Sequence, residues 1–241
     1  MESNHKPYRY EESFKRIKDI LNQSDINYTE ESELPDRSKL TFSNGFYAYC
    51  SALFIDIRGS SQLPKKYRRP KLARLYRAYI SEAVAILNGL DSCREINIVG
   101  DGAWAVFNTP YKPDIDAVFS HAAMLNSMVK VLNYELKKKD IDPVSVGIGM
   151  SYGRALMVKA GYSGSGINDV VYMGDVVNEA AKLAAKGNKS YFDSTMMVSD
   201  VFKSNLSEKN QGFLRWHSSY ECWQGDVINT LMDEWYDENC T

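Results

Sequence analysis

Apolar residues recur with a helical period near the start of the chain, and this texture changes after residue 45. In the segment "YEESFKRIKDIL", Phe14, Ile17 and Leu21 fall three or four positions apart, the spacing of one helix face. The stretch that follows, "NQSDINYTEESELPDRSK", has no period and is rich in residues that favour turns. The pattern predicts a short helix followed by a linker.

From Phe46 onward, apolar runs alternate with helical periods. "FYAYCSALFIDI" is typical of a strand that becomes buried toward its end, and "RPKLARLYRAYISEAVAILNGL" has the period of an amphipathic helix. "REINIVGD" and "GAWAVFN" predict two strands joined by a hairpin turn, and a second long helix is predicted from Ile115 to Lys139. "PVSVGIGMSYGRALMVKAG" then predicts two short strands about a glycine turn, followed by the helix "GDVVNEAAKLAAKG" and the strand "TMMVS".

The order of these elements predicts the fold class. A strand, a helix, two strands, a helix, two strands, a helix and a strand favour an α+β fold, in which helices cover a mainly antiparallel sheet. The change of texture divides the chain into an N-terminal helix and linker, residues 1–45, and one domain with a C-terminal extension, residues 46–241.

Composition and charge narrow the possible functions. Hydrophobic residues make up 44% and charged residues 25% of the 241 residues, which is the balance of a globular domain with a core. The net charge of −2 gives no overall field that would recruit nucleic acid or an anionic membrane. Four cysteines without paired spacing and three scattered histidines argue against a zinc site. Since no apolar run has the length of a membrane span, we expect a cytoplasmic protein with no membrane partner.

Two aspartates stand at predicted strand ends. Asp56 closes the first strand of the domain, and Asp101 lies in the predicted hairpin turn. If the sheet brings them together, their charges repel unless a cation lies between them, and oxygen ligands suit Mg²⁺ or Mn²⁺. The turn at Arg58, Gly59 and Ser60 leads into a basic helix, so it offers backbone N–H groups to a phosphate. Each aspartate alone is more often a helix cap or part of a plain turn, whereas the pair favours a metal site.

Three segments together resemble the class III nucleotidyl cyclases: "LFIDIRGSSQL", "NIVGDGAWAVF" and "VGIGMSYGRALMV…YMGDVVNEAAKLA". They span roughly Phe46 to Ser199 in the order and spacing of the family. The resemblance implies a ferredoxin-like α+β domain that works as a head-to-tail homodimer, with active sites at the interface. It also implies two Mg²⁺ or Mn²⁺ ions per site, held by Asp56, Asp101 and the backbone carbonyl of Ile57.

The same resemblance implies that the partner subunit supplies two catalytic side chains from the helix after the last glycine turn. The family asparagine matches Asn178, and the position of the family arginine holds Lys182. The implied reaction is attack of the ribose 3′-hydroxyl on the α-phosphate with loss of pyrophosphate, in which positioning and charge do most of the work. Lysine is a point charge without the planar guanidinium fork, so Arg58 or another base is an alternative for this role.

The family selects its base at two positions, which here hold Asn97 and Val171. Neither purine pattern is present, and an amide can donate and accept toward the edge of uracil or cytosine. In this the chain resembles the bacterial pyrimidine cyclases of phage-defence systems. The resemblance implies UTP as substrate, with CTP or ATP as alternatives, and a cyclic nucleotide that acts in antiviral defence on a separate effector. Tyr47, Tyr49 and Phe54 could narrow the base pocket, although packing explains any one of them.

Two other classes of function stay open. A degenerate cyclase domain that only binds a nucleotide would explain the loss of the arginine, although both aspartates and Asn178 are present. RNA binding would explain the basic segment "KKYRRPKLARLYR" with its interleaved aromatics. Tyr76 and Tyr79, however, fall on the apolar face of the predicted helix, so we expect no nucleic-acid partner.

Overall fold

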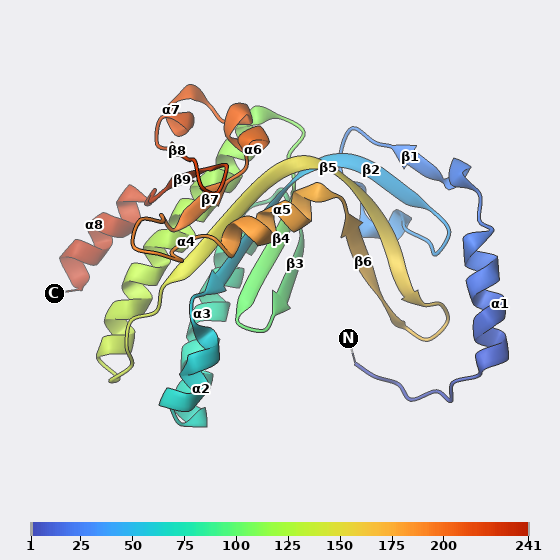
Figure 1. Ribbon diagram of the computed structural model, residues 1–241, viewed down its shortest axis with the longest axis horizontal. Helices are drawn as coiled ribbons and strands as arrows, with labels where there is room; N and C mark the ends of the chain where they lie inside the picture. The colour runs from blue at the N-terminus through green and yellow to red at the C-terminus, as the bar shows by residue number, and fades with distance from the viewer. Residues whose placement is uncertain (1, 241) are drawn as a thin grey trace.

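The computed structural model describes residues 2–240, and its centre is one large sheet (Figure 1). The strands along the main path pair in the order β3-β4-β2-β5-β7-β9-β8; β1 pairs with β2, and β6 pairs with β5. Most pairs are antiparallel, and the pairs β1–β2 and β5–β7 are parallel. The strands are β1 (Tyr28–Glu30), β2 (Gly45–Ile57), β3 (Cys93–Val99), β4 (Gly102–Asn108), β5 (Val146–Tyr162), β6 (Ile167–Met173), β7 (Met196–Val198), β8 (Arg215–His217) and β9 (Cys222–Gly225).

Helices lie on both faces of this sheet, which confirms the predicted α+β class. The α-helices are α1 (Tyr10–Leu21), α2 (Leu63–Lys66), α3 (Arg69–Asn88), α4 (Lys112–Lys137), α5 (Asp175–Ala184), α6 (Asp200–Asn205), α7 (Glu208–Gln211) and α8 (Thr230–Asn239). Within the described residues, no helix is long and apolar enough to cross a membrane.

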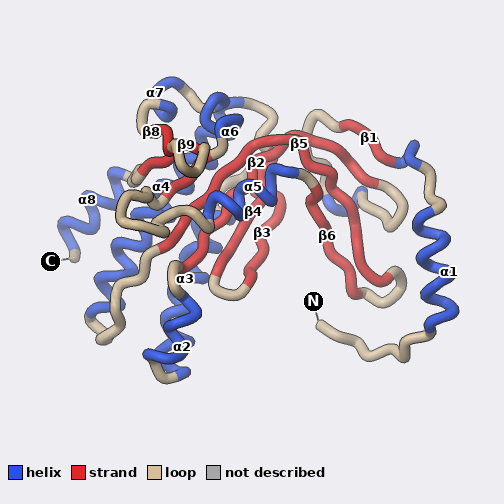
Figure 2. The backbone as a smooth tube through the Cα atoms, viewed as in Figure 1, coloured by secondary structure: helices blue, strands red, loops and turns tan. Residues whose placement is uncertain are grey.

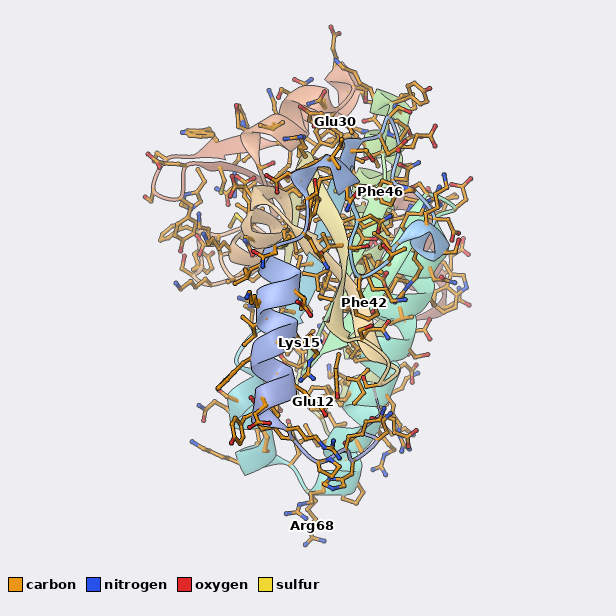
Figure 3. The ribbon with its side chains drawn as sticks, turned by 90° about the vertical axis from the view of Figure 1, so that its right-hand side faces the viewer. Glu12, Lys15, Glu30, Phe42, Phe46 and Arg68 are labelled. Atoms are coloured by element: carbon orange, nitrogen blue, oxygen red, sulfur yellow. The ribbon has the colours of Figure 1, made fainter. Side chains whose placement is uncertain are left out.

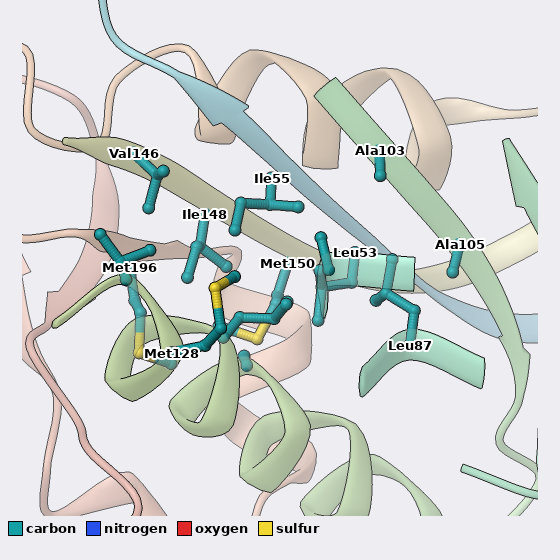
Figure 4. Packing of buried hydrophobic residues seen from close by; sticks show 14 of the residues in the cluster. Leu53, Ile55, Leu87, Ala103, Ala105, Met128, Val146, Ile148, Met150 and Met196 are labelled. Carbon is teal, nitrogen blue, oxygen red and sulfur yellow. The ribbon is translucent and has the colours of Figure 1, made fainter. Parts of the chain in front are cut away.

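The main hydrophobic core lies between the sheet and the helices α3 and α4. Because side chains alternate along a strand, Leu53, Ile55 and Ile57 of β2 all face this core. They meet the apolar faces that the helical periods predicted in α3 and α4, where Tyr79 and Leu125 are fully buried. Figure 4 shows part of this layer, with strand residues of β2, β4 and β5 packed around Met128 of α4.

The opposite face of the sheet is covered by α5, which approaches β5 closely. Two glycines on β5 make this approach possible. A Cβ at Gly149 would lie 2.1 Å from the carbonyl oxygen of Ala180, and a Cβ at Gly147 would lie 2.1 Å from that of Ala184. Any other residue at these positions would push α5 away from the sheet. The two glycines therefore fix the distance between α5 and the strands that carry the candidate site.

The segment predicted as two short strands about a glycine turn is one strand, so this prediction is wrong. β5 runs without interruption for 17 residues, and Gly153 pairs with Cys50 of β2 inside the ladder. The partner that closes the hairpin is β6, which the sequence patterns did not predict. Figure 2 shows β5 and β6 as an arm that extends away from the body of the sheet.

The N-terminal segment contains the predicted helix α1, which has no buried residue. It lies beside the tip of the β5–β6 arm, where Lys6 donates to the carbonyl oxygen of Gly164 at 3.1 Å and Arg16 stacks over the ring of Tyr162. Figure 3 faces this side of the molecule and labels Glu12 on α1. The proposed division of the chain at residue 45 stays a prediction, and residues 28–30 before it add β1 to the sheet.

Candidate active site

Strand pairing places the two candidate metal ligands side by side. Asp56, the last residue but one of β2, is directly opposite Gly102 of β4. Asp101 precedes Gly102 in the β3–β4 turn, and its charge acts on Asp56. A Cβ at position 102 would lie 3.1 Å from Oδ1 of Asp56, so the glycine leaves the space into which this carboxylate turns. The sheet register therefore explains how residues from separate strands meet.

Arg58 ties this carboxylate pair to the end of α5. Its Nη2 donates to Oδ2 of Asp56 at 2.9 Å, and its Nη1 donates to the carbonyl oxygen of Ala185 at 3.0 Å. The carbonyl belongs to the C-cap of α5, where the helix dipole favours a positive charge. Its side chain is 17% exposed, so the guanidinium interacts with both partners in a partly desolvated setting.

The electrostatics of the pair favour a bound cation. Burial raises the pKa of Asp56, the charge of Asp101 raises it further, and Arg58 lowers it, which together give a pKa of about 6. The Oδ2 atom of Asp101 is buried and has no hydrogen-bond partner among residues 2–240. Two adjacent carboxylates, one with an unsatisfied oxygen, form a hard oxygen donor set of the kind that suits Mg²⁺ or Mn²⁺.

The described residues contain no group of three or more histidine, cysteine, aspartate or glutamate side chains that could hold a metal ion. A site built on Asp56 and Asp101 therefore leaves coordination positions for a backbone carbonyl, waters and phosphate oxygens, which is the usual arrangement for Mg²⁺ at a nucleotide. Ile57 has its side chain in the core and pairs with Val146, and its carbonyl lies at the strand end beside Asp56. The residues present fit a divalent cation, and the role of each as a ligand stays a prediction.

The turn after β2 differs from the predicted phosphate site in one respect. Gly59 has φ of +64° and allows the tight turn, and the amide of Gln62 donates to the carbonyl oxygen of Gly59 at 3.0 Å. Ser60 begins a 3₁₀ turn of only three residues, and the long helix α3 starts at Arg69. The turn at Ser60 therefore does not lead directly into the long basic helix, and phosphate binding at this turn stays a prediction. Backbone N–H groups remain the available donors.

Asn178 and Lys182 are exposed on α5, and the hollow that they line contains neither Asp56 nor Asp101. They line a hollow of about 540 Å³ together with Asp175, Glu179 and Lys186.

Asp56 lines a different hollow of about 230 Å³, to which the end of α5 contributes Ala181, Ala184 and Ala185. The two hollows share no residue. A single chain therefore does not bring the predicted catalytic pair to the predicted metal ligands.

The Asp56 hollow has an aromatic wall that sequence reasoning missed. Trp104 of β4 stands opposite both Phe54 of β2 and Asn97 of β3, so the three side chains form one row on the α5 face of the sheet. The rings of Phe54 and Trp104 stack with centroids 5.2 Å apart and an interplanar angle of 5°. Both rings line the hollow beside Asp56. The pairing of Trp104 with Asn97 across the GDG turn was the signal that could have found it.

The other residues predicted near the base lie elsewhere in the single chain. Val171 is 40% exposed on β6, opposite Val158, and does not line the Asp56 hollow. Tyr49 stacks on Tyr152 and Tyr47 lies under Arg154, so neither ring lines this hollow. Of the three aromatics proposed to narrow the pocket, only Phe54 borders it.

Comparison with known proteins decides the family. The model of the adenylate and guanylate cyclase catalytic domain matches residues 44–223. A uridylate cyclase of Gulbenkiania mobilis is 43% identical over 99% of this chain and 100% of its own length. A uridylate cyclase of Treponema porcinum is 39% identical over 95% of this chain and 80% of its own. The chain belongs to the class III nucleotidyl cyclases.

Solved structures of the class III family share the fold. The adenylyl cyclase CyaB from P. aeruginosa has a TM-score of 0.60 and 20% identity, covering 71% of this chain and 85% of its own. A bacterial light-regulated adenylyl cyclase has a TM-score of 0.61 and 21% identity, covering 81% and 99%. The recognition from three motifs and the predicted fold are thus confirmed, and the chain is a cyclase enzyme.

Proposed function

We propose that this class III cyclase converts UTP to cyclic UMP and pyrophosphate. The observation that carries this proposal is the cross-strand row of Phe54, Trp104 and Asn97, whose two rings line the same hollow as Asp56 of the Asp56–Asp101 pair. The names of the two relatives that are 43% and 39% identical support UTP. A cytidylate cyclase of Staphylococcus aureus is 27% identical over 69% of this chain, which supports CTP less strongly.

The carboxylates of Asp56 and Asp101 and the carbonyl of Ile57 would hold two divalent ions. When bound, the ions lower the pKa of the ribose 3′-hydroxyl and neutralise charge on the phosphates. The 3′-oxygen forms a bond to the α-phosphorus and loses its proton to solvent. The bond from the α-phosphorus to the bridging oxygen breaks, and pyrophosphate leaves with that electron pair.

Arg58 has a second task in this mechanism. Its guanidinium donates to Asp56 and compensates one of the two carboxylates. With a divalent cation held by the carboxylates, Arg58 would be free to pair with a phosphate oxygen of the nucleotide. Gly59 keeps the turn open and Ser60 offers its amide and hydroxyl to the same phosphates.

The catalytic pair comes from a second copy of the chain. Because Asn178 and Lys182 line a different hollow from Asp56 on their own subunit, a head-to-tail homodimer supports the reaction by bringing the α5 surface of one copy to the carboxylates of the other. In that arrangement Asn178 orients the ribose and Lys182 places a positive charge at the developing phosphate charge. Each active site is then shared between two subunits.

Base selection rests on Asn97 with Trp104 and Phe54. The Asn97 amide donates to O4 or accepts from N3–H of uracil, and the stacked rings, of which Trp104 is its cross-strand neighbour, line the hollow that contains Asp56. Val171 does not line the Asp56 hollow of its own chain, so it would add an apolar contact from β6 only as part of the second copy. A role of the cyclic nucleotide in antiviral defence, through a separate effector, is supported by the resemblance to phage-defence cyclases alone.

Incubation of the purified chain with each of the four NTPs and Mn²⁺ tests the proposal. Pyrophosphate release with cyclic UMP as the dominant product, identified by mass spectrometry, is the expected result. Cyclic AMP or cyclic GMP as the dominant product would contradict the base assignment. Failure to release pyrophosphate from any NTP would instead show a domain that only binds nucleotide.

A further inference from the structure

Tyr79 of α3 has a hydroxyl group that the fold alone does not explain. The side chain is completely buried in the main hydrophobic core. Its hydroxyl has no hydrogen-bond partner among the described residues. A buried hydroxyl without a partner is unfavourable, and phenylalanine would fill the same space without that cost. The hydroxyl is therefore a buried donor that no described residue satisfies.

The complementary group is on the neighbouring β3–β4 turn. Oδ2 of Asp101 is a buried acceptor without a partner, whereas the Tyr79 hydroxyl is a buried donor without one. α3 packs against β3 and β4, the two strands that this turn connects (Figure 1). Burial raises the pKa of the Tyr79 hydroxyl, and the charges of Asp56 and Asp101 raise it further, as expected for a phenol close to the two carboxylates.

The two carboxylates are supported unequally in the metal-free chain. Asp56 accepts a hydrogen bond from Arg58, whereas the buried oxygen of Asp101 accepts none. Carboxylates that bind a metal through one oxygen are usually held at the other by a hydrogen-bond donor, which fixes their orientation. Tyr79 can be a donor of this kind, because its side chain is packed in the core and its hydroxyl is shielded from solvent.

We propose that Tyr79 is a positioning residue, whose hydroxyl donates to Oδ2 of Asp101 when a divalent cation is bound and so orients the other oxygen of this carboxylate toward the ion. The inference rests on the proposed metal site. It assigns Tyr79 no contact with the nucleotide. The buried donor of Tyr79 and the buried acceptor of Asp101 would then satisfy each other.

Binding of Mn²⁺ alone, followed by the electron paramagnetic resonance signal of free Mn²⁺, tests the role of Tyr79 without any turnover. Tyr79→Phe is expected to weaken Mn²⁺ binding about 10-fold, the effect of losing a hydrogen bond to a metal ligand. Its unfolding temperature in EDTA should not fall, because only an unpaired hydroxyl is removed. Unchanged Mn²⁺ affinity in Tyr79→Phe, or no saturable Mn²⁺ binding by the unaltered chain, would overturn the proposal.

Tyr172 provides a matched control. It is also buried, and its hydroxyl also lacks a partner among residues 2–240, but it belongs to the other hydrophobic cluster and faces Glu95 rather than the aspartates. Tyr172→Phe is expected to leave Mn²⁺ affinity unchanged. An equal loss of affinity in both variants would show a general packing effect and would overturn the assignment to Tyr79.

The variant Asp101→Asn tests whether Tyr79 affects Mn²⁺ binding through the Asp101 carboxylate. In Asp101→Asn the carboxylate is gone, so adding Tyr79→Phe should cost no further Mn²⁺ affinity. A full additional 10-fold loss in the double variant would contradict the inference. These readouts measure metal binding only. If no NTP yields pyrophosphate but Tyr79→Phe still weakens Mn²⁺ binding, the proposed reaction fails while the role of Tyr79 stands.

Discussion

Replacing Asp56 by asparagine is expected to stabilise the metal-free chain while it abolishes activity. Asparagine keeps an oxygen that can accept from Arg58 and removes the repulsion from Asp101. The folded-state pKa of Asp56, about 6, lies above its ordinary value of 3.8, so the folded chain binds the proton more tightly than the unfolded chain. The resulting penalty is absent below pH 3.8, grows as pH rises between 3.8 and about 6, and is complete above pH 6.

The size of this penalty follows from the same pKa values. At about 1.4 kcal/mol per pH unit, the rise from 3.8 to about 6 sets an upper limit of about 3 kcal/mol. The Asp56 side chain is 45% exposed, so solvent screening reduces the expected gain in the free energy of unfolding to about 1 kcal/mol. For a domain of this size, that gain raises the unfolding temperature by about 2–4 °C.

Thermal unfolding in EDTA at pH 8 and pH 5 measures the effect. Asp56→Asn should unfold at a higher temperature than the unaltered chain at pH 8, and the difference should shrink at pH 5, where Asp56 is mostly protonated. Asp233→Asn serves as the control. It removes a carboxylate of α8 that pairs with Lys130 of α4, and it should not raise the unfolding temperature at either pH. A lower unfolding temperature for Asp56→Asn at pH 8, or an equal increase at both values, would refute the reasoning.

Three further predictions concern the same machinery. Gly149→Ala should lower the free energy of unfolding by about 3 kcal/mol in a denaturant titration, because its Cβ meets the carbonyl of Ala180 at 2.1 Å; a neutral effect would show that α5 adapts. Lys182→Arg should keep turnover whereas Lys182→Ala loses about 100-fold, and wild-type turnover in Lys182→Ala would exclude this lysine. At limiting Mn²⁺, activity should fall as pH drops through 6, since protons compete at Asp56, and added Mn²⁺ should restore it.

Local patterns predicted those parts of the fold in which each element is specified by its own residues. The helical period predicted α1 over its full length, and it placed Tyr79 and Leu125 on faces that are buried. The hairpin around Asp101 followed from its glycines, because the turn needs backbone freedom that other residues lack.

Features that depend on strands meeting at a distance could not be predicted in this way. The glycines of this segment indicated a turn, but Gly153 pairs with Cys50 in a 13-residue ladder that continues through β5, so tertiary pairing outweighs local preference. β1 joins the sheet although its residues are polar and have no period, because it pairs through the backbone with the start of β2.

In the candidate site, too, local patterns predicted some residues, whereas others depend on how distant strands pair. Asp56 and Asp101 were found because each stands beside a glycine turn at a strand end. The Trp104–Phe54 stack, the bond from Arg58 to Ala185 and the unpaired hydroxyl of Tyr79 depend on register and packing. Single residues of these types occur throughout the chain, so only the folded structure distinguishes those that surround the carboxylates.

Mixing two inactive variants tests most directly whether the active site is shared between subunits. Asp56→Ala and Asn178→Ala should each form no cyclic nucleotide. After mixing in equal amounts, random pairing puts half of the chains into mixed dimers, each with one intact site out of two, so about a quarter of the wild-type activity should return. Activity that stays at zero in the mixture, although mass spectrometry detects mixed dimers, would contradict a site built from Asp56 of one subunit and Asn178 of the other.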